Sequence, residues 1–133
     1  MDCIFCKLAN GIIHTNSIYE DEDFNVILDA APAARGHVLI IPKRHYENIL
    51  DADEACISKV MPLAKRIAKK QMSALDCDGI NILQNNGEAA GQTVFHLHVH
   101  LIPRYKGKEN ILTWDHESFS EEEFNNIKEQ LRL

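Results

Sequence analysis

The alternation of apolar and polar positions along the chain predicts five β-strands. Successive side chains on a strand point to opposite faces, so alternating stretches bounded by turn residues are typical of strands. We therefore expect strands at residues 17–20, 24–28, 37–42, 79–84 and 94–103. The first two should form a hairpin around an acidic turn. The last two are joined by a short loop and should be antiparallel neighbours.

Two other stretches have the periodicity of amphipathic helices. The longer one covers residues 53–75 and contains Pro62, which removes a backbone hydrogen bond and so predicts a kink or two abutting helices. Its apolar face is expected to comprise Ile57, Val60, Met61, Ala64, Ile67, Ala68 and Leu75.

A capping-box signature, Ser120 with Glu123, predicts the start of a short helix near the end of the chain. Phe124, Ile127 and Leu131 would give this helix one apolar face that docks on the rest of the domain. In the irregular stretch before it, Trp114 is expected to pack. We assign no chemistry to this segment.

Length and charge narrow the classes of partner. The 133 residues suit one domain, and a net charge of −6 argues against a general nucleic-acid or membrane-surface binder. No apolar run approaches the roughly 20 residues needed to cross a bilayer, and the N-terminus lacks the features of a signal peptide. We expect a cytoplasmic protein with a small-molecule partner, in which the four cysteines are thiols or metal ligands.

The strand at residues 94–103 places three histidines on one face. His96, His98 and His100 alternate with Leu97, Val99 and Leu101, which are expected to face apolar packing. A single histidine on a strand is usually a satisfied, partly buried residue. Three imidazoles side by side are costly to bury without a task, so the pattern indicates catalysis or metal binding.

The N-terminal Cys3-Ile4-Phe5-Cys6 has the spacing of half a zinc site. By itself it supplies two of the four ligands that a tetrahedral structural ion requires. Packed thiols or a redox motif would explain the pair as well, although no strand precedes the motif to build a redox fold around it.

Several polar residues could belong to a binding site or to ordinary turns. The loop at residues 85–93 carries amides, a hydroxyl and glycines that suit phosphate oxygens, but a plain hairpin connection explains the glycines equally well. Asp29 ends a strand and reads most simply as a turn or cap residue. His37 and His45 flank a buried strand and could be surface residues.

The segment His96-Leu97-His98-Val99-His100-Leu101-Ile102 resembles the signature of the histidine triad (HIT) family of nucleotide hydrolases and transferases. The resemblance extends back to the N-terminal cysteines and is greatest to the Hint branch. It implies an α+β fold with a five-stranded antiparallel sheet, packed helices, and a homodimer in which two sheets extend each other. Residues 1–133 would form one HIT domain, with a core at 1–105 and a C-terminal extension at 106–133.

The resemblance also implies the chemistry. His98 would attack the α-phosphorus of a nucleoside 5'-phosphoramidate and form a nucleotidyl-histidine that water cleaves. His100 and His37 would assist as further catalytic residues, and Asp29 would bind the ribose of a purine nucleotide. Asn85 and Thr93 would contact the α-phosphate, and Gly91, Gln92, His98 and His100 would complete the nucleotide-binding site.

The resemblance also implies a metal site, because some bacterial-type members of this family bind structural zinc through ligands that correspond to Cys3, Cys6, His45 and His96 here. A closed site of two cysteines and two histidines suits structure, and it would remove His96 from catalysis. Two other functions stay open: diadenosine polyphosphate hydrolysis or nucleotidyl transfer by the same covalent step, and a non-catalytic, zinc-stabilised nucleotide-binding or interaction protein.

Overall fold

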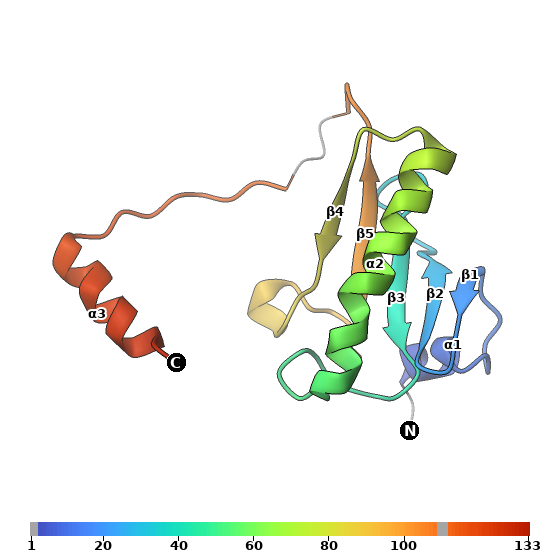
Figure 1. Ribbon diagram of the computed structural model, residues 1–133, viewed down its shortest axis with the longest axis horizontal. Helices are drawn as coiled ribbons and strands as arrows, with labels where there is room; N and C mark the ends of the chain where they lie inside the picture. Colours follow the sequence, from blue (N-terminus) through green and yellow to red (C-terminus); the bar gives the residue numbers. More distant parts are fainter. Residues whose placement is uncertain (1–2, 109–111) are drawn as a thin grey trace.

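Five antiparallel strands form one sheet in the order β1-β2-β3-β5-β4 (Figure 1). The structure is a computed structural model that describes residues 3–108 and 112–133, so residues 1–2 and 109–111 of the expected domain lie outside it. The elements are α1 (Ile4–Ala9), β1 (Ser17–Glu20), β2 (Phe24–Leu28), β3 (Val38–Pro42), α2 (Glu54–Leu75), β4 (Gly79–Leu83), the short 3-10 turn η1 (Glu88–Ala90), β5 (Val99–Arg104) and α3 (Glu121–Leu131).

The expected α+β class and the five antiparallel strands are confirmed. β1 and β2 form the expected hairpin, and β4 pairs antiparallel with β5. The helix α1 was not predicted from the sequence, because six residues are too few to show a helical period. The strand β5 begins at Val99, five residues later than expected, because the preceding segment pairs elsewhere: the N–H of Leu97 donates to the carbonyl oxygen of Tyr46 at 2.7 Å.

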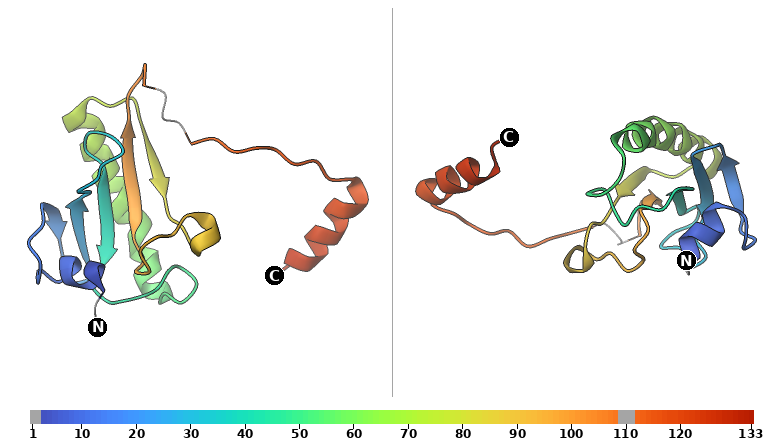
Figure 2. Two further views of the ribbon diagram at one scale, coloured as in Figure 1. Left: turned by 180° about the vertical axis from the view of Figure 1, so that it is seen from behind. Right: turned by 90° about the horizontal axis from the view of Figure 1, so that it is seen from below.

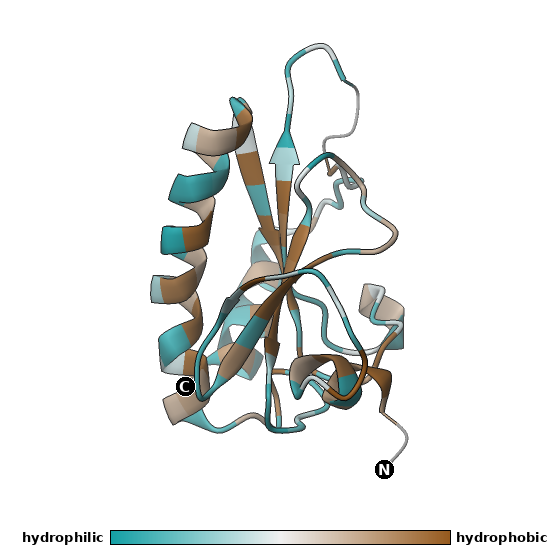
Figure 3. Ribbon diagram, turned by 90° about the vertical axis from the view of Figure 1, so that its right-hand side faces the viewer, coloured by the Kyte–Doolittle hydropathy of each residue, from teal (hydrophilic) through white to brown (hydrophobic). Residues whose placement is uncertain are grey.

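The helix α2 covers one face of the sheet (Figures 1 and 2). Figure 3 shows apolar and polar residues following one another in bands along this helix. Such bands are expected when one face of a helix is apolar and the other polar. Buried residues of α2 and of the three strands β2, β3 and β5 form the larger core: Phe24, Val26, Val38, Ile40, Val60, Leu63, Ala64, Ile67, Val99 and Leu101. Because side chains alternate along each strand, the other face of the sheet is left for α1 and for the site.

The helix α2 runs without interruption through Pro62, so of the two expected outcomes, a kink or two abutting helices, the division into two helices is excluded. Proline has no N–H to donate to the carbonyl group one turn earlier in the helix. Because Pro62 lies on the exposed face, that carbonyl group faces water. Met61 was expected in the core but is 59% exposed, whereas Leu63 is buried in its place. Val60, Ala64 and Ile67 are buried as expected, so the periodicity predicted which face of the helix is buried but not the residues at its edge.

The C-terminal segment leaves the body of the domain (Figures 1 and 2). Residues 112–120 have no regular structure, and α3 contacts no other helix or strand among the described residues. The predicted helix is therefore present, but its docking on the domain is wrong. Trp114 is 75% exposed, so the expectation that it packs is wrong too. Within the described ranges, no helix combines the length and the apolar character needed to cross a membrane.

Candidate active site and metal centre

A pocket of about 700 Å³ lies on the face of the sheet opposite α2. It is lined by residues of α1, β2, β3 and β5 and by the loop between β4 and β5. Six residues predicted from the sequence meet in it: Asp29, Asn85, Gly91, Thr93, His98 and His100. A pocket of this size accommodates a nucleotide-sized ligand.

His98 is oriented by one hydrogen bond. Its Nδ1 lies 2.7 Å from the carbonyl oxygen of His96, and because a carbonyl only accepts, Nδ1 carries the hydrogen. In the neutral ring Nε2 is then unprotonated and free to act as a nucleophile. Burial lowers the pKa of His98, which favours this neutral form. The ring of Phe5 packs edge-on against it, with centroids 4.9 Å apart.

His37 and His100 form a second hydrogen-bonded chain. The N–H of Ala33 donates to Nδ1 of His37 at 3.0 Å, so the hydrogen of neutral His37 is on Nε2. This Nε2 lies 2.9 Å from Nδ1 of His100 and donates to it. The remaining hydrogen of His100 is therefore on Nε2, the nitrogen not used by His37.

Both rings of this pair are kept neutral by their surroundings. Burial, with His98 and His37 close by, lowers the pKa of His100 to about 4. Burial also lowers the pKa of His37, against the opposing effect of Asp29. At neutral pH the pair supplies a hydrogen-bond donor to the pocket and no positive charge.

Asp29 acts both as a turn residue and as a pocket residue. Its Oδ1 accepts the backbone N–H of Ala31 at 2.9 Å, as expected of a turn. Its Oδ2 lies 3.5 Å from Nε2 of His37. The carboxylate thus forms part of the pocket wall while the turn holds it in place.

The loop before β5 contributes residues of two kinds. Asn85, Gly91 and Thr93 line the pocket, and Gly91 has a φ of +94°, a left-handed conformation that glycine adopts without strain. A Cβ at position 91 would lie 3.6 Å from Nδ2 of Asn85. The backbone turn at Gly91 therefore sits directly against the amide of Asn85.

Gln92 differs from its predicted role. Its buried side chain accepts the N–H of Gly87 at 2.8 Å and donates to the carbonyl oxygens of Glu47 at 2.7 Å and Val94 at 3.1 Å. It is not among the residues that line the pocket. With its amide engaged in this way, Gln92 braces the loop from behind rather than facing a ligand.

The apolar wall of the pocket was missed by sequence reasoning. Phe5, Ile27 and Leu39 belong to this wall, and Ile27 and Leu39 pair across β2 and β3. Strand alternation could have found two of them, because Ile27 lies two residues before Asp29 and Leu39 two residues after His37. No signal in the sequence pointed to Phe5 beyond its place between the two cysteines.

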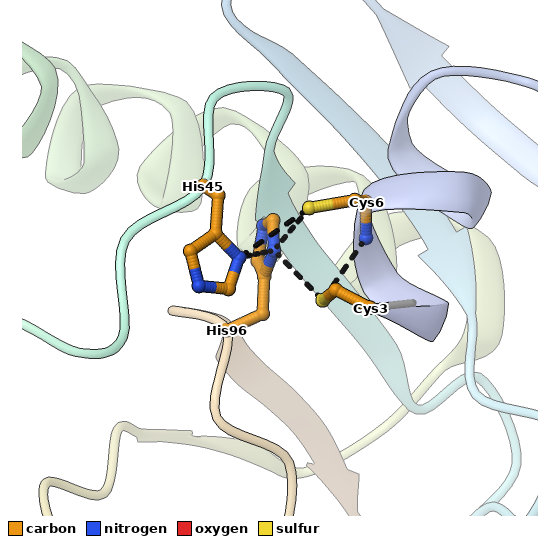
Figure 4. A group of neighbouring side chains, drawn as sticks. All are labelled: Cys3, Cys6, His45 and His96. Carbon is orange, nitrogen blue, oxygen red and sulfur yellow. Dashed lines mark hydrogen bonds between the residues drawn. The ribbon is translucent and has the colours of Figure 1, made fainter. Parts of the chain in front are cut away.

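Cys3, Cys6, His45 and His96 converge on one point (Figure 4). One ligand atom from each lies within 4.8 Å of all the others. Sγ of Cys6 is 3.3 Å from Nδ1 of His45, Sγ of Cys3 is 3.4 Å from Nδ1 of His96, and the two Nδ1 atoms are 3.1 Å apart. A tetrahedral zinc ion with ordinary bond lengths separates its ligand atoms by about 3.3–3.8 Å. The observed separations lie within a few tenths of an ångström of this range, so the four residues fit such an ion.

The second nitrogen of His96 has the partner expected of a metal-bound histidine. Nε2 donates to the carbonyl oxygen of Pro42 at 2.8 Å, which leaves the lone pair of Nδ1 directed at the cluster. His96 is fully buried and does not line the pocket. A zinc ion held here would join α1, the turn after β3 and the segment before β5.

Comparison with known proteins agrees with this architecture. The model of the HIT domain family matches residues 10–107. Adenosine 5'-monophosphoramidase HNT1 of Saccharomyces cerevisiae is 41% identical over 110 residues, which cover 83% of this chain and 67% of that protein. Adenylylsulfatase HINT3 of Arabidopsis thaliana is 37% identical over 132 residues, which cover 99% of this chain and 66% of that protein.

Two solved structures extend the comparison. SMU.412c from Streptococcus mutans UA159 has a TM-score of 0.91 at 38% identity, covering 98% of this chain and 83% of its own. A Zn-bound histidine triad family protein from Mycobacterium smegmatis has a TM-score of 0.79 at 40% identity, covering 88% of this chain and 85% of its own. The fold and site are those of a small nucleotide-handling α+β protein with a histidine-lined pocket, and the chain belongs to the HIT domain family.

Proposed function

We propose that this protein is a purine nucleotide hydrolase that cleaves the P–N bond of nucleoside 5'-phosphoramidates through a covalent intermediate on His98. The observation that carries the proposal is the state of His98, whose hydrogen is committed to the carbonyl of His96 and whose Nε2 is left free beside the pocket. The naming of the yeast relative as an adenosine 5'-monophosphoramidase supports the same substrate class.

The proposed reaction proceeds in two displacements. Nε2 of His98 attacks the α-phosphorus, a P–N bond to the imidazole forms, and the P–N bond to the leaving amine breaks while the amine takes a proton from water. Water then attacks the same phosphorus, releasing the nucleoside monophosphate and restoring neutral His98. The Nε2 hydrogen of His100 would donate to a phosphoryl oxygen as negative charge builds there.

Binding would use the rest of the pocket. The carboxylate of Asp29 can accept hydrogen bonds from ribose hydroxyls, and the apolar side chains of Phe5, Ile27 and Leu39 suit the flat face of a base. Asn85 and Thr93 offer donors to the phosphate. In this proposal Gln92 only supports the loop that carries them.

We further propose that Cys3, Cys6, His45 and His96 hold a structural zinc ion. The convergence of the four side chains supports it, as does the Zn-bound relative from Mycobacterium smegmatis. The ion would stabilise the fold as a cross-link, while the reacting groups come from the protein. The homodimer and the cytoplasmic location expected from the sequence stay predictions.

A phosphosulfate is a second candidate substrate, because the Arabidopsis relative that spans nearly the whole chain is named an adenylylsulfatase. The same attack on the α-phosphorus would expel sulfate instead of an amine. The pocket would also suit diadenosine polyphosphate hydrolysis, nucleotidyl transfer or simple nucleotide binding. Rates on an adenosine phosphoramidate, adenosine phosphosulfate and a diadenosine polyphosphate would rank these leaving groups.

The covalent step is tested by stopping the reaction rapidly in alkali and searching the peptides by mass spectrometry. We expect a nucleotidyl adduct on the peptide that contains His98. His98→Ala should lose turnover but still bind adenosine monophosphate, whereas His116→Ala, an exposed histidine outside the pocket, should react normally. An active His98→Ala protein would refute the mechanism, and absence of both adduct and turnover on all three substrates would favour a binding protein.

A further inference from the structure

The short helix α1 contributes side chains to two sites at once. Cys3 caps its N-terminus, and Cys6 lies in its first turn. Both sulfur atoms point into the cysteine–histidine cluster (Figure 4). Phe5 and Leu8, from the same helix, line the pocket. A displacement of α1 therefore changes the cluster and the pocket together.

The two ends of α1 are held in different ways. At the C-terminal end, Ala9 is fully buried against β2 and β3, and the side-chain amide of Asn10 donates to the carbonyl oxygen of Lys43 at 2.9 Å. At the N-terminal end, the N–H of Cys6 donates to Sγ of Cys3 at 3.4 Å, within the cluster. A helix of six residues is not stable by itself. An ion bound to both sulfur atoms would therefore fix the N-terminal end of α1.

Phe5 connects the cluster to the pocket. It lies between Cys3 and Cys6 in the sequence, and its ring packs edge-on against that of His98, with centroids 4.9 Å apart. Phe5 is only half-buried, so part of its ring is open to a ligand in the pocket. A nucleotide base packed on this ring would bury the remaining surface and would hold α1 from the pocket side.

We propose that Phe5 couples zinc binding to nucleotide binding. An ion in the cluster fixes α1 and so places Phe5 for the base. A nucleotide packed on Phe5 holds α1 and so keeps Cys3 and Cys6 in place for the ion. Phe5 is a positioning residue here and takes no part in the reaction. The inference rests on the proposed zinc site and on the proposed use of the pocket by a nucleotide.

A different route between the two sites runs through His96. Its ring belongs to the cluster, and its carbonyl oxygen accepts the hydrogen of His98, without any contribution from α1. Ile4 and Phe5 distinguish the two routes, because they are neighbours between the same two cysteines. Ile4 is 46% exposed and is not among the residues that line the pocket, whereas Phe5 is. Truncation of Phe5 should remove the coupling through α1, and truncation of Ile4 should not.

The coupling is measured as a binding equilibrium, without turnover. Zinc affinity is determined in chelator buffers that fix the free zinc concentration, with and without saturating adenosine monophosphate. The affinity for adenosine monophosphate is determined by equilibrium dialysis of zinc-loaded and zinc-free protein, at a temperature at which circular dichroism shows both to be folded. We expect each ligand to raise the affinity of the other about fivefold or more, and by the same factor, because coupling is reciprocal. Affinities that do not depend on the other ligand would overturn the proposal.

Phe5→Ala and Ile4→Ala form a matched pair, because each shortens one apolar side chain of α1 and leaves both cysteines in place. Ile4→Ala should keep the coupling factor of the unchanged protein. Phe5→Ala should bind zinc with a factor close to one. A factor in Phe5→Ala equal to that of the unchanged protein would mean that the sites communicate through His96, and the proposal would be wrong. If Phe5→Ala binds too little zinc to measure, Phe5→Leu takes its place and should give a factor between one and that of the unchanged protein.

Two further measurements separate this inference from the proposals on which it rests. Elemental analysis tests for one zinc ion per chain, and the dialysis itself tests for saturable binding of adenosine monophosphate. A protein that binds both ligands with a coupling factor of one keeps the zinc site and the pocket, and only the coupling is overturned. A protein that fails to bind zinc or the nucleotide overturns the coupling together with the site that failed.

Discussion

The ring of His98 is held by the backbone of His96: Nδ1 of His98 lies 2.7 Å from the carbonyl oxygen of His96. The side chain of His96 points the other way and joins the cluster with Cys3, Cys6 and His45. One residue thus connects the proposed zinc site to the proposed nucleophile, through its imidazole on one side and its backbone on the other. A change in the cluster should therefore alter the orientation of the His98 ring in the pocket.

Removal of the proposed zinc ion is expected to impair catalysis, although the ion would not contact the substrate. A chelator that strips zinc should lower the melting temperature and reduce turnover roughly 10- to 100-fold, because the carbonyl of His96 would no longer be held in register with His98. Elemental analysis before and after chelation, with rates on the same samples, checks this. Restored zinc should restore both properties. Full activity in a sample proved free of metal would show that the cluster does not orient His98.

Replacement of Asp29 should weaken nucleotide binding more than it slows the chemistry. Asp29→Asn keeps the shape of the side chain and removes the charge that would accept from ribose hydroxyls, so we expect KM to rise about tenfold with a smaller change in kcat. Glu117→Gln, which removes an exposed carboxylate far from the pocket, is the matched control. An equal loss in kcat with KM unchanged would assign Asp29 to the reaction step instead.

Gly36 sits at a position that only glycine fills well. Its φ is +87°, and an added Cβ would clash with the side chain of Leu75. Gly36→Ala should lower the free energy of unfolding. Because Gly11 has a φ of +75° with open space around it, the difference between Gly36→Ala and Gly11→Ala isolates the clash. We expect this difference to be about 1–3 kcal/mol by urea denaturation. Equal losses would mean that Leu75 moves aside freely.

The His37 and His100 pair should make stability fall in mild acid. Both rings have folded-state pKa values below the ordinary value, that of His100 being about 4, so between pH 6.5 and pH 4 the unfolded chain binds more protons. The free energy of unfolding should decrease as the pH falls through this window, by up to about 1.4 kcal/mol per pH unit for each group. His100→Asn should have the shallower slope, which unfolding curves at several pH values would measure. Parallel slopes would mean that His100 does not titrate as its burial implies.

The local alternation of apolar and polar residues predicted most of the secondary structure. The hairpin of β1 and β2 was predicted from alternation and from its acidic turn, with the same bounds as in the structure. The beginning of β5 was not, because the segment around Leu97 bonds to Tyr46, about fifty residues earlier in the chain. The docking of α3 failed for a similar reason: an apolar face shows that a helix needs a partner and does not say which surface supplies it.

The sequence by itself determined the five strands, the helices α2 and α3, the three histidines and, through the family resemblance, the residues that could bind metal or nucleotide. These follow from backbone periodicity and side-chain chemistry, which act over a few residues. Only the tertiary structure decided that Cys3 meets His96, that Phe5 packs on His98, that Gln92 turns away from the pocket and which nitrogen of each imidazole is free. Such features depend on contacts between residues up to about ninety positions apart, which form when the sheet and α1 pack together.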